Sequence, residues 1–164
     1  MSIPEKPGRT ILLVCTGNLC RSPMAAALLR RLLSEDESRR NWRVFSAGLW
    51  AADGESASMG AIAAMAERGI DITDHVSRRL TRPMVEEADL ILGMTGAHVE
   101  AMRAAFPEAR ERIHLLAEMA GERHDVADPY GLSPATYRAT ATELERLIRK
   151  GYERIVALAE NSGR

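Results

Sequence analysis

The sequence predicts one α/β domain built on a mostly parallel β-sheet. Its 164 residues are enough for a single domain with a substantial core. Short apolar segments of strand length alternate with segments of helical periodicity, the pattern of strands joined by crossover helices. The first apolar segment, residues 10–14, lacks polar alternation and fits a strand buried on both faces. We assign residues 1–164 to this domain and expect residues 1–9, with two prolines and a glycine, to be a flexible N-terminal segment.

The first half of the chain is expected to contain two strands and two helices. In order, these are a strand at residues 10–14, a loop at 15–22, a helix from 22 to about 33, a strand at 42–47, a loop at 49–55 and a helix at 58–68. Ser22 and Pro23 indicate the first helix start, because serine caps helices and proline favours the first helical position. The predicted buried face of the second helix has apolar residues at helical spacing: Met59, Ile62 and either Met65 or Ala66.

The second half continues the alternation of helices and strands. We expect a short helix at residues 81–87, a strand at 89–94, a helix at 97–105, a strand at 113–116, a long loop at 121–134 and a helix at 134–160. Pro107 ends the middle helix, because proline cannot continue one. The last helix has an apolar stripe that we expect to be buried: Leu144, Leu147, Ile148, Ile155 and either Leu158 or Ala159.

Composition excludes several classes of function. The net charge of −1 argues against a general electrostatic grip on nucleic acid. The apolar run at residues 11–14 is far too short to span a membrane, and no cleavable signal pattern follows it. The two cysteines are too few for a disulfide framework or a structural zinc site. We therefore expect a cytoplasmic protein without nucleic-acid or membrane partners.

The segment after the first predicted strand has the composition of a phosphate-binding loop. A loop between a strand and a helix can turn successive backbone N–H groups inward around a tetrahedral anion. Gly17 and Asn18 tolerate the left-handed backbone that such a loop requires. Arg21 supplies a planar fork for two phosphate oxygens, and the following helix adds its positive end.

Cys15 is the candidate nucleophile of this loop. A helix N-terminus and a neighbouring arginine stabilise a thiolate, which is a strong nucleophile and can form a phosphocysteine intermediate. Ser22 can donate a hydrogen bond to the sulfur when it leaves phosphorus. An isolated cysteine at a strand end is commonly an inert core residue. The surrounding glycine, asparagine and arginine favour the catalytic interpretation.

Loss of phosphate from an ester also needs a proton donor for the leaving oxygen. Asp128, in the longest predicted loop, is the candidate, with a tyrosine two positions later. Pro129 restricts it to an extended conformation. A single Asp-Pro pair is often only a turn, and Asp125 competes for the role.

The sequence resembles the low-molecular-weight protein tyrosine phosphatase family. Residues 15–23 match its Cys-x5-Arg-Ser-Pro signature, and residues 128–130 match its general-acid motif. The resemblance implies a four-stranded parallel sheet with helices on both faces. It also implies that Arg21 binds phosphate, and that Asp128 first protonates the leaving group and then activates water. Further phosphate-binding positions carried over from the signature are Thr16, Gly17, Asn18, Leu19, Cys20 and Ser22.

The same resemblance implies the surroundings of the loop. Asn18, Ser22, Ser46 and His75 form a hydrogen-bonded set that holds its shape. The implied substrate is a phosphorylated protein, with inorganic phosphate as product and inhibitor, and no cofactor is required. His75, His98, His114 and His124 are scattered without metal-ligand spacing, so we expect no metal site and interpret the last three as surface or packing residues.

The identity of the phosphorylated group depends on the pocket wall. Leu49, Trp50 and Tyr130 are candidates for apolar walls that select an aryl phosphate. One branch of the family acts on phosphoarginine, and a small polar residue such as threonine occupies the position of Leu19 there. A leucine suits a phenyl ring better than a guanidinium, so we predict tyrosine over arginine phosphatase activity.

Three other hypotheses remain beside these two. An arsenate reductase shares the fold and loop but needs cysteines beyond Cys20, and this chain has none. A phosphate-binding module without catalysis would not need Cys15. Cys20 itself is a candidate redox partner that captures an oxidised Cys15 as a disulfide, although it is equally a loop-filling residue. Nucleotide binding is not expected, since no P-loop or dinucleotide motif follows the strand.

Overall fold

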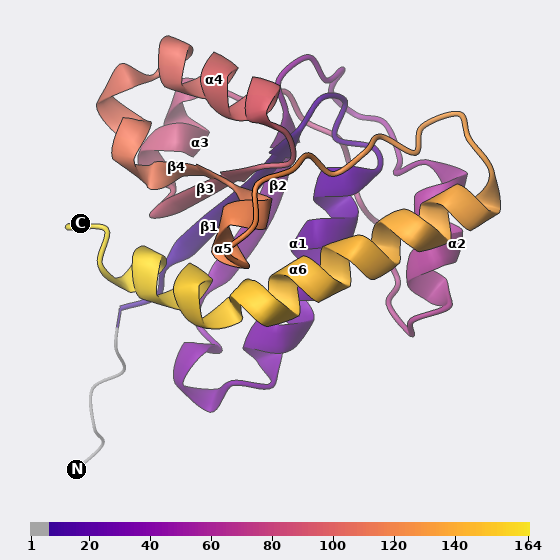
Figure 1. The fold of residues 1–164 in the computed structure, drawn as a ribbon, viewed down its shortest axis with the longest axis horizontal. Helices are drawn as coiled ribbons and strands as arrows, with labels where there is room; N and C mark the ends of the chain where they lie inside the picture. Colours follow the sequence, from indigo (N-terminus) through magenta and orange to yellow (C-terminus); the bar gives the residue numbers. More distant parts are fainter. Residues whose placement is uncertain (1–6) are drawn as a thin grey trace.

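The computed structural model describes residues 7–164, which form a four-stranded parallel sheet covered by helices (Figure 1). In chain order the elements are β1 (Thr10–Cys15), α1 (Arg21–Ser34), the 3-10 turn η1 (Glu37–Arg39), β2 (Arg43–Gly48), α2 (Met59–Ala66), α3 (Arg82–Glu87), β3 (Leu90–Gly93), α4 (Gly96–Ala105), the 3-10 turn η2 (Pro107–Arg112), β4 (Ile113–Leu115), α5 (Leu116–Met119) and α6 (Pro134–Glu160). The predicted α/β class and parallel sheet are confirmed.

The strand order is β2-β1-β3-β4, so β1 lies inside the sheet between β2 and β3. All six residues of β1 are buried, as expected for a strand covered on both faces. The chain moves from β1 to β2 in one direction and from β2 to β3 in the other. Because such crossovers are right-handed, α1 and α3 lie on opposite faces.

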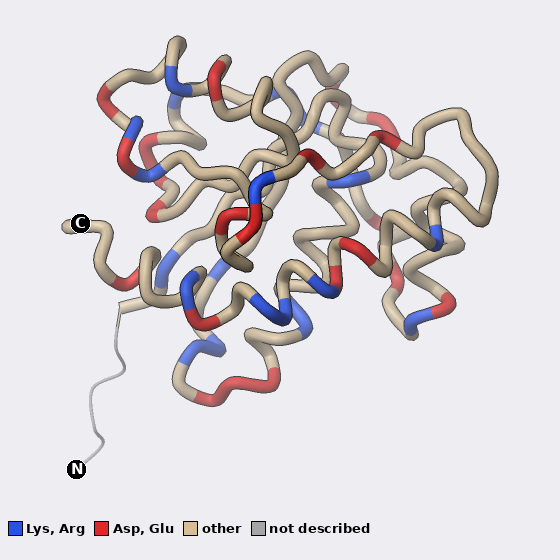
Figure 2. The backbone as a smooth tube through the Cα atoms, viewed as in Figure 1, with Lys and Arg blue, Asp and Glu red and all other residues tan. Residues whose placement is uncertain are grey.

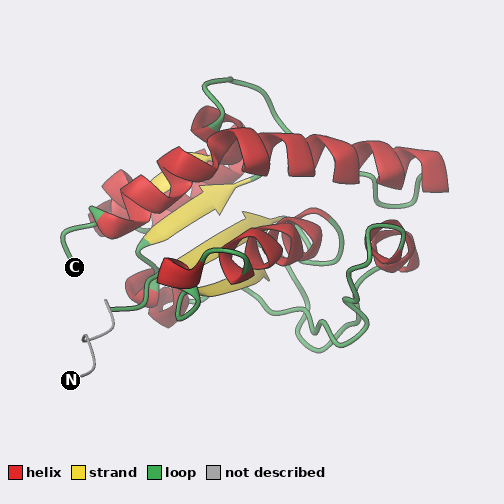
Figure 3. Cartoon of the chain, turned by 90° about the horizontal axis from the view of Figure 1, so that it is seen from below, coloured by secondary structure: helices red, strands yellow, loops and turns green. Residues whose placement is uncertain are grey.

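The long helix α6 packs against α1 on one face of the sheet, and Figure 3 shows it running along that side. Its predicted bounds are confirmed, and so is its stripe: Leu144, Leu147, Ile148, Ile155 and Ala159 are buried. Gly151 permits a close crossing, because a Cβ there would lie 2.7 Å from the Cβ of Met119 in α5.

Acidic and basic residues are interspersed along the backbone (Figure 2).

Two helical predictions are wrong in detail. The helix α1 begins at Arg21 with Cys20 as its N-cap residue, whereas Ser22 was expected to cap it. The hydroxyl of Ser22 instead bonds to groups of the preceding loop. The helix α2 buries Ala61, Ala64 and Met65, while Met59 is 86% exposed.

The face of α2 is set by its neighbour α6. A Cβ at Gly60 would lie 2.4 Å from ring atoms of Tyr137, so this small residue lets the two helices approach closely. The helix also ends at Ala66, before the predicted residue 68. The apolar pattern of eight residues therefore did not reveal which side faces the protein.

Other differences concern short elements. The helix α5 and the 3-10 turn η1 were not predicted, because segments of three or four residues carry too few periodic positions. The 3-10 turn η2 was not predicted either. The expected flexible segment at residues 1–9 lies mostly outside the described residues. No helix among residues 7–164 is long and apolar enough to cross a membrane.

Candidate active site

The loop between β1 and α1 forms the floor of a pocket at the carboxyl edge of the sheet. Cys15 is the last residue of β1 and Arg21 the first of α1, so both side chains are positioned by regular structure. The pocket has a volume of about 160 Å³. It is lined by Cys15, Thr16, Gly17, Leu19, Cys20, Arg21, Asp128 and Tyr130. Parallel sheets commonly bind ligands at this edge.

Cys15 lies at the end of a short hydrogen-bonded chain. Its sulfur is 2.9 Å from Ser22 Oγ, and the side-chain amide of Asn18 donates to the same hydroxyl oxygen at 2.9 Å. Because Ser22 Oγ accepts from Asn18, its own hydrogen is available to the sulfur; the other acceptor within reach, the carbonyl oxygen of Ala47, is 3.5 Å away. The network therefore orients a donor toward Cys15 Sγ.

Asn18 holds the turn of the loop. Its φ of 58° is the only positive value at a non-glycine position among the described residues, whereas Gly17 does not adopt the left-handed conformation we expected. Asn18 Nδ2 also donates to Ser46 Oγ at 2.9 Å, and Asn18 Oδ1 accepts from the backbone N–H of Arg78. Four hydrogen bonds of its side chain and carbonyl compensate for the strained backbone.

His75 supplies the fourth of these bonds. Its Nε2 lies 2.8 Å from the carbonyl oxygen of Asn18, so Nε2 must carry the hydrogen and donate it. Burial lowers the pKa of His75, and the hydrogen bond to Asn18 opposes this effect only in part. The structure thus brings together Asn18, Ser22, Ser46 and His75, the set inferred from the sequence.

The end of β2 supports the loop from the other side. A Cβ at Gly48 would lie 2.6 Å from the carbonyl oxygen of Thr16 and 2.9 Å from the amide nitrogen of Asn18. The next two residues, Leu49 and Trp50, donate backbone N–H groups to the carbonyls of Cys15 and Thr16 at 3.0 Å. Glycine is required here because the two backbones touch.

The guanidinium of Arg21 is buried and held at two points. Its Nη1 donates to the carbonyl oxygen of Val126 at 3.0 Å, and its Nη2 donates to Thr16 Oγ1 at 3.3 Å. Its Nε is buried and has no hydrogen-bond partner among the described residues. Buried donors are nearly always satisfied, so this edge of the fork fits an anion in the pocket.

Asp128 lies over the pocket on the loop before α6. Its Oδ2 is 3.5 Å from Arg21 Nη2, its Oδ1 accepts from the backbone N–H of Tyr130, and its side chain is 49% exposed. The competing Asp125 does not line the pocket; its Oδ1 accepts from the backbone N–H of Gly96 at 2.8 Å. The geometry therefore favours Asp128 as the group that meets a leaving oxygen.

The expected pocket wall needs a correction. Leu19 and Tyr130 line the pocket, but Leu49 and Trp50 do not. Leu49 packs against the hydrophobic core, and Trp50 is 63% exposed. Their backbone N–H groups support the loop, so these two residues contribute through the main chain.

Cys20 faces a different set of partners from Cys15. Its sulfur lies 3.1 Å from Ser58 Oγ and 3.4 Å from Tyr137 Oη, and both cysteines are free thiols. Burial raises the pKa of Cys20, which opposes thiolate formation. The two thiols of the loop are thus held in unlike environments.

His98 is a site residue that the sequence did not reveal. It is 3% exposed, and its Nε2 lies 2.9 Å from Thr16 Oγ1. Burial, with the Arg21 charge as a further cause, lowers the pKa of His98 to about 4. The contact joins residues 82 positions apart, so no local spacing could have indicated it.

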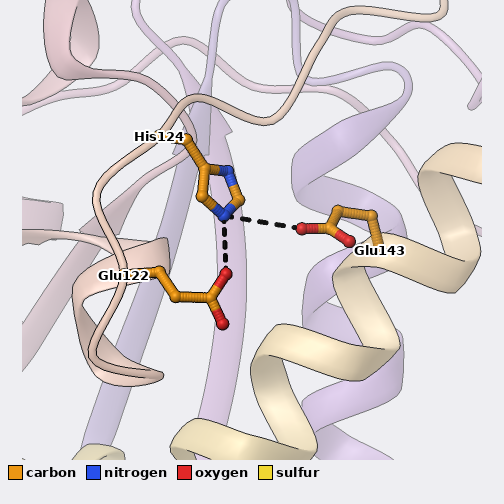
Figure 4. A group of neighbouring side chains, drawn as sticks. All are labelled: Glu122, His124 and Glu143. Atoms are coloured by element: carbon orange, nitrogen blue, oxygen red, sulfur yellow. Dashed lines mark hydrogen bonds and ion pairs between the residues drawn. The ribbon is translucent and has the colours of Figure 1, made fainter.

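A third histidine, His124, lies at the start of the loop that carries Asp128 (Figure 4). Its Nε2 is 2.8 Å from Glu122 Oε1 and 3.7 Å from Glu143 Oε1, a grouping of possible metal ligands that sequence spacing did not show. Glu122 is also paired with Arg146 and Lys150. Since cations already neutralise the carboxylates, the cluster acts as an ion-pair link between this loop and α6.

Comparison with known protein families gives a match that covers most of the chain. The family described as low molecular weight phosphotyrosine protein phosphatase matches residues 10–160. The chain belongs to this family. The members are cysteine-dependent phosphatases that act on phosphorylated proteins, and the four-stranded parallel fold is shared with their solved structures.

Relatives within the family are divided between two substrates. Wzb of Escherichia coli K12, a low molecular weight protein-tyrosine-phosphatase, is 38% identical over 140 residues, 85% of this chain and 90% of its own. A protein-arginine-phosphatase of Geobacillus stearothermophilus is 40% identical over 146 residues, 88% of this chain and 95% of its own. The crystal structure of a low molecular weight protein tyrosine phosphatase from T. tengcongensis superposes with a TM-score of 0.84 at 38% identity, covering 90% of this chain and 99% of that one.

Proposed function

We propose that this protein hydrolyses phosphotyrosine in proteins through a phosphocysteine formed on Cys15. The observation that favours tyrosine as the phosphorylated residue is the apolar part of the pocket lining, where Leu19 and Tyr130 line the same pocket as Cys15. A phenyl ring fits between such side chains, whereas a guanidinium would lose its hydrogen bonds there. The chemistry requires no metal ion, so activity should persist in the presence of a chelator.

In the first step the Cys15 thiolate attacks phosphorus in line with the tyrosyl oxygen. The S–P bond forms as the P–O bond breaks, and protonated Asp128 transfers its proton to the departing phenolic oxygen. Arg21 grips two of the phosphate oxygens through the edge that includes Nε. Donors fixed before the reaction stabilise the charge of the transition state without reorganising.

In the second step water hydrolyses the phosphocysteine. The Asp128 carboxylate accepts a proton from water as its oxygen attacks phosphorus, and the Cys15 sulfur leaves as a thiolate. Ser22 stabilises the departing sulfur, because its Oγ lies 2.9 Å away and its hydrogen is oriented by Asn18. Inorganic phosphate is released and can bind again as an inhibitor.

Phosphoarginine is the second candidate substrate, favoured by the arginine phosphatase among the relatives. Comparison of kcat/KM on two peptides of identical sequence, one with phosphotyrosine and one with phosphoarginine, separates the two. We expect a preference for phosphotyrosine of about 5- to 150-fold, since an unpaired buried polar group costs roughly 1–3 kcal/mol. A preference for phosphoarginine would contradict the proposal.

Substitution of Leu19 tests the reason for that preference. Leu19→Thr should move the ratio of the two kcat/KM values toward phosphoarginine, and Leu19→Met, which keeps an apolar side chain of similar size, should not. An unchanged ratio in Leu19→Thr would show that another part of the pocket selects the substrate.

Cys20 is proposed as a redox guard of the same site. A Cys15 oxidised to a sulfenic acid would react with the Cys20 thiol, forming the S–S bond and releasing water. A thiol reductant would then restore both cysteines. Activity of Cys20→Ser should recover less completely than wild type after peroxide and reductant; equal recovery would eliminate this role.

A further inference from the structure

We infer that His98 is a positioning residue that holds Arg21 in its phosphate-binding orientation through the hydroxyl of Thr16. The inference rests on the proposed function only in assigning the bound phosphate to Arg21. It gives a role to a buried histidine that takes no part in the two chemical steps.

The ring of His98 is fixed by the start of α4. The backbone N–H of Thr95 donates to His98 Nδ1 at 3.1 Å, and the backbone N–H of His98 donates to Thr95 Oγ1 at 3.1 Å. This reciprocal pair is a capping box. Because Nδ1 accepts a hydrogen bond, the hydrogen of the neutral ring must be on Nε2.

The Nε2–H group of His98 therefore donates to Thr16 Oγ1, 2.9 Å away. Arg21 Nη2 donates to the same oxygen at 3.3 Å. The two donors occupy both lone pairs of the hydroxyl, so Thr16 cannot rotate to another partner without losing a bond. The oxygen is thereby held as an acceptor for Arg21.

Both terminal nitrogens of the Arg21 guanidinium are then held by hydrogen bonds. Nη1 bonds to the carbonyl oxygen of Val126, and Nη2 bonds to the Thr16 oxygen that His98 orients. The buried Nε is the donor left without a partner among the described residues. Small errors in the position of such a group weaken phosphate binding and transition-state stabilisation together.

Two substitutions separate this role from simple packing. An asparagine amide oxygen lies near the place of His98 Nδ1 and can accept from Thr95, but its side chain is too short to reach Thr16. A glutamine amide nitrogen lies near the place of Nε2 and can still donate to Thr16. We expect His98→Asn to lower kcat/KM for p-nitrophenyl phosphate about 10- to 100-fold, with a parallel rise in the inhibition constant of inorganic phosphate. His98→Gln should retain most of both.

A double-mutant cycle with Thr16→Val tests the route of the effect. If His98 acts through the hydroxyl, adding His98→Asn to Thr16→Val should lower kcat/KM by less than about twofold, because the hydroxyl is already absent. Independent, multiplicative losses would overturn the inference. So would equal losses of activity in His98→Asn and His98→Gln, or an inhibition constant for phosphate that neither variant changes.

Phosphate affinity measured by calorimetry on a Cys15→Ser background keeps this test apart from the proposed function. Weaker binding of inorganic phosphate in His98→Asn than in His98→Gln supports the inference even without turnover, and equal binding contradicts it. A wild-type protein that does not hydrolyse p-nitrophenyl phosphate would instead contradict the proposed function.

Discussion

The two loops that meet at the pocket are built in opposite ways. In the loop between β1 and α1 and the first turn of α1, Asn18, Arg21 and Ser22 are all at most 4% exposed, and each makes at least two hydrogen bonds. In the loop before α6, Asp128 and Tyr130 are exposed. Its fixed points lie upstream, where Asp125 accepts from Gly96 and the N–H of Val126 donates to Met94.

This difference matches two chemical tasks. Groups that stabilise charge on a transferring phosphoryl group act best when they are fixed in advance. A proton donor must reach the leaving oxygen of a protein-bound phosphate, so it has to lie where a large substrate can approach. Val126 connects the two regions, because its carbonyl oxygen holds Arg21 Nη1 while its own loop carries Asp128.

The largest expected effect comes from the exposed loop. Asp128→Asn should lower kcat on a phosphotyrosine peptide by about 10²- to 10⁴-fold, since the amide cannot protonate the phenolic oxygen. Asp125→Asn is the matched control, because its amide oxygen can still accept from Gly96. Steady-state kinetics should show a change of less than about twofold for the control. If the control loses as much activity as Asp128→Asn, the assignment of the acid is wrong.

The buried loop should be the more sensitive of the two to a single methyl group. Gly48→Ala places a Cβ against the backbone of Thr16 and Asn18, which should lower the free energy of unfolding by roughly 1–3 kcal/mol and impair activity. Gly131→Ala has open space around it and strains only a φ of 76°, at about 1 kcal/mol. Urea denaturation of both variants measures the contrast, and a smaller loss for Gly48→Ala would contradict it.

The smallest expected effect concerns the ion-pair link at the start of the exposed loop. The Glu122 carboxylate raises the pKa of His124 above its value in the unfolded chain. The resulting stabilisation is fully present below about pH 6.5 and is lost as pH rises through the higher folded pKa. Wild type should therefore exceed His124→Gln in Tm by no more than about 2 °C at pH 5.5, because the link is on the surface.

Thermal unfolding of both proteins at several pH values checks this link. The difference in Tm should disappear by about pH 9. A difference that is independent of pH would show that His124 stabilises the loop by packing. Neither outcome should alter activity as strongly as the change at Asp128.

The same two loops show what the sequence could predict. The buried loop is contiguous, so its proposed nucleophile, its arginine and a left-handed residue at position 17 or 18 could be inferred from neighbouring residues. The structure places that conformation at Asn18 alone of the two. The sequence and its resemblance favoured Asp128 over Asp125, but the bond that holds Asp125 to Gly96 in another element could not be inferred from neighbouring residues. The contact of His98 with Thr16 could not be inferred either, because the two residues lie 82 positions apart in the sequence.

The exposed positions of Trp50 and Met59 follow a related rule. The helical pattern places Met59 on a buried face, and Trp50 was expected to form a pocket wall, but both side chains lie largely in solvent. Whether such a side chain is buried depends on how closely neighbouring elements approach, as at Gly48 and Gly60. Hydrophobic periodicity predicts the helices, the strands and most of the core. The close contacts between neighbouring elements depend on the folded structure and cannot be predicted from periodicity.

The central claim is that phosphate passes through Cys15. The direct test is to quench the enzyme with acid during turnover of a phosphotyrosine peptide and to digest it with trypsin. Cleavage after Arg9 and Arg21 yields a peptide of residues 10–21 that contains both cysteines. Mass spectrometric fragmentation should place one phosphoryl group on Cys15, and Cys15→Ser should show no turnover. Phosphorylation of Cys20 or His98 instead, or continued turnover by Cys15→Ser, would contradict the account.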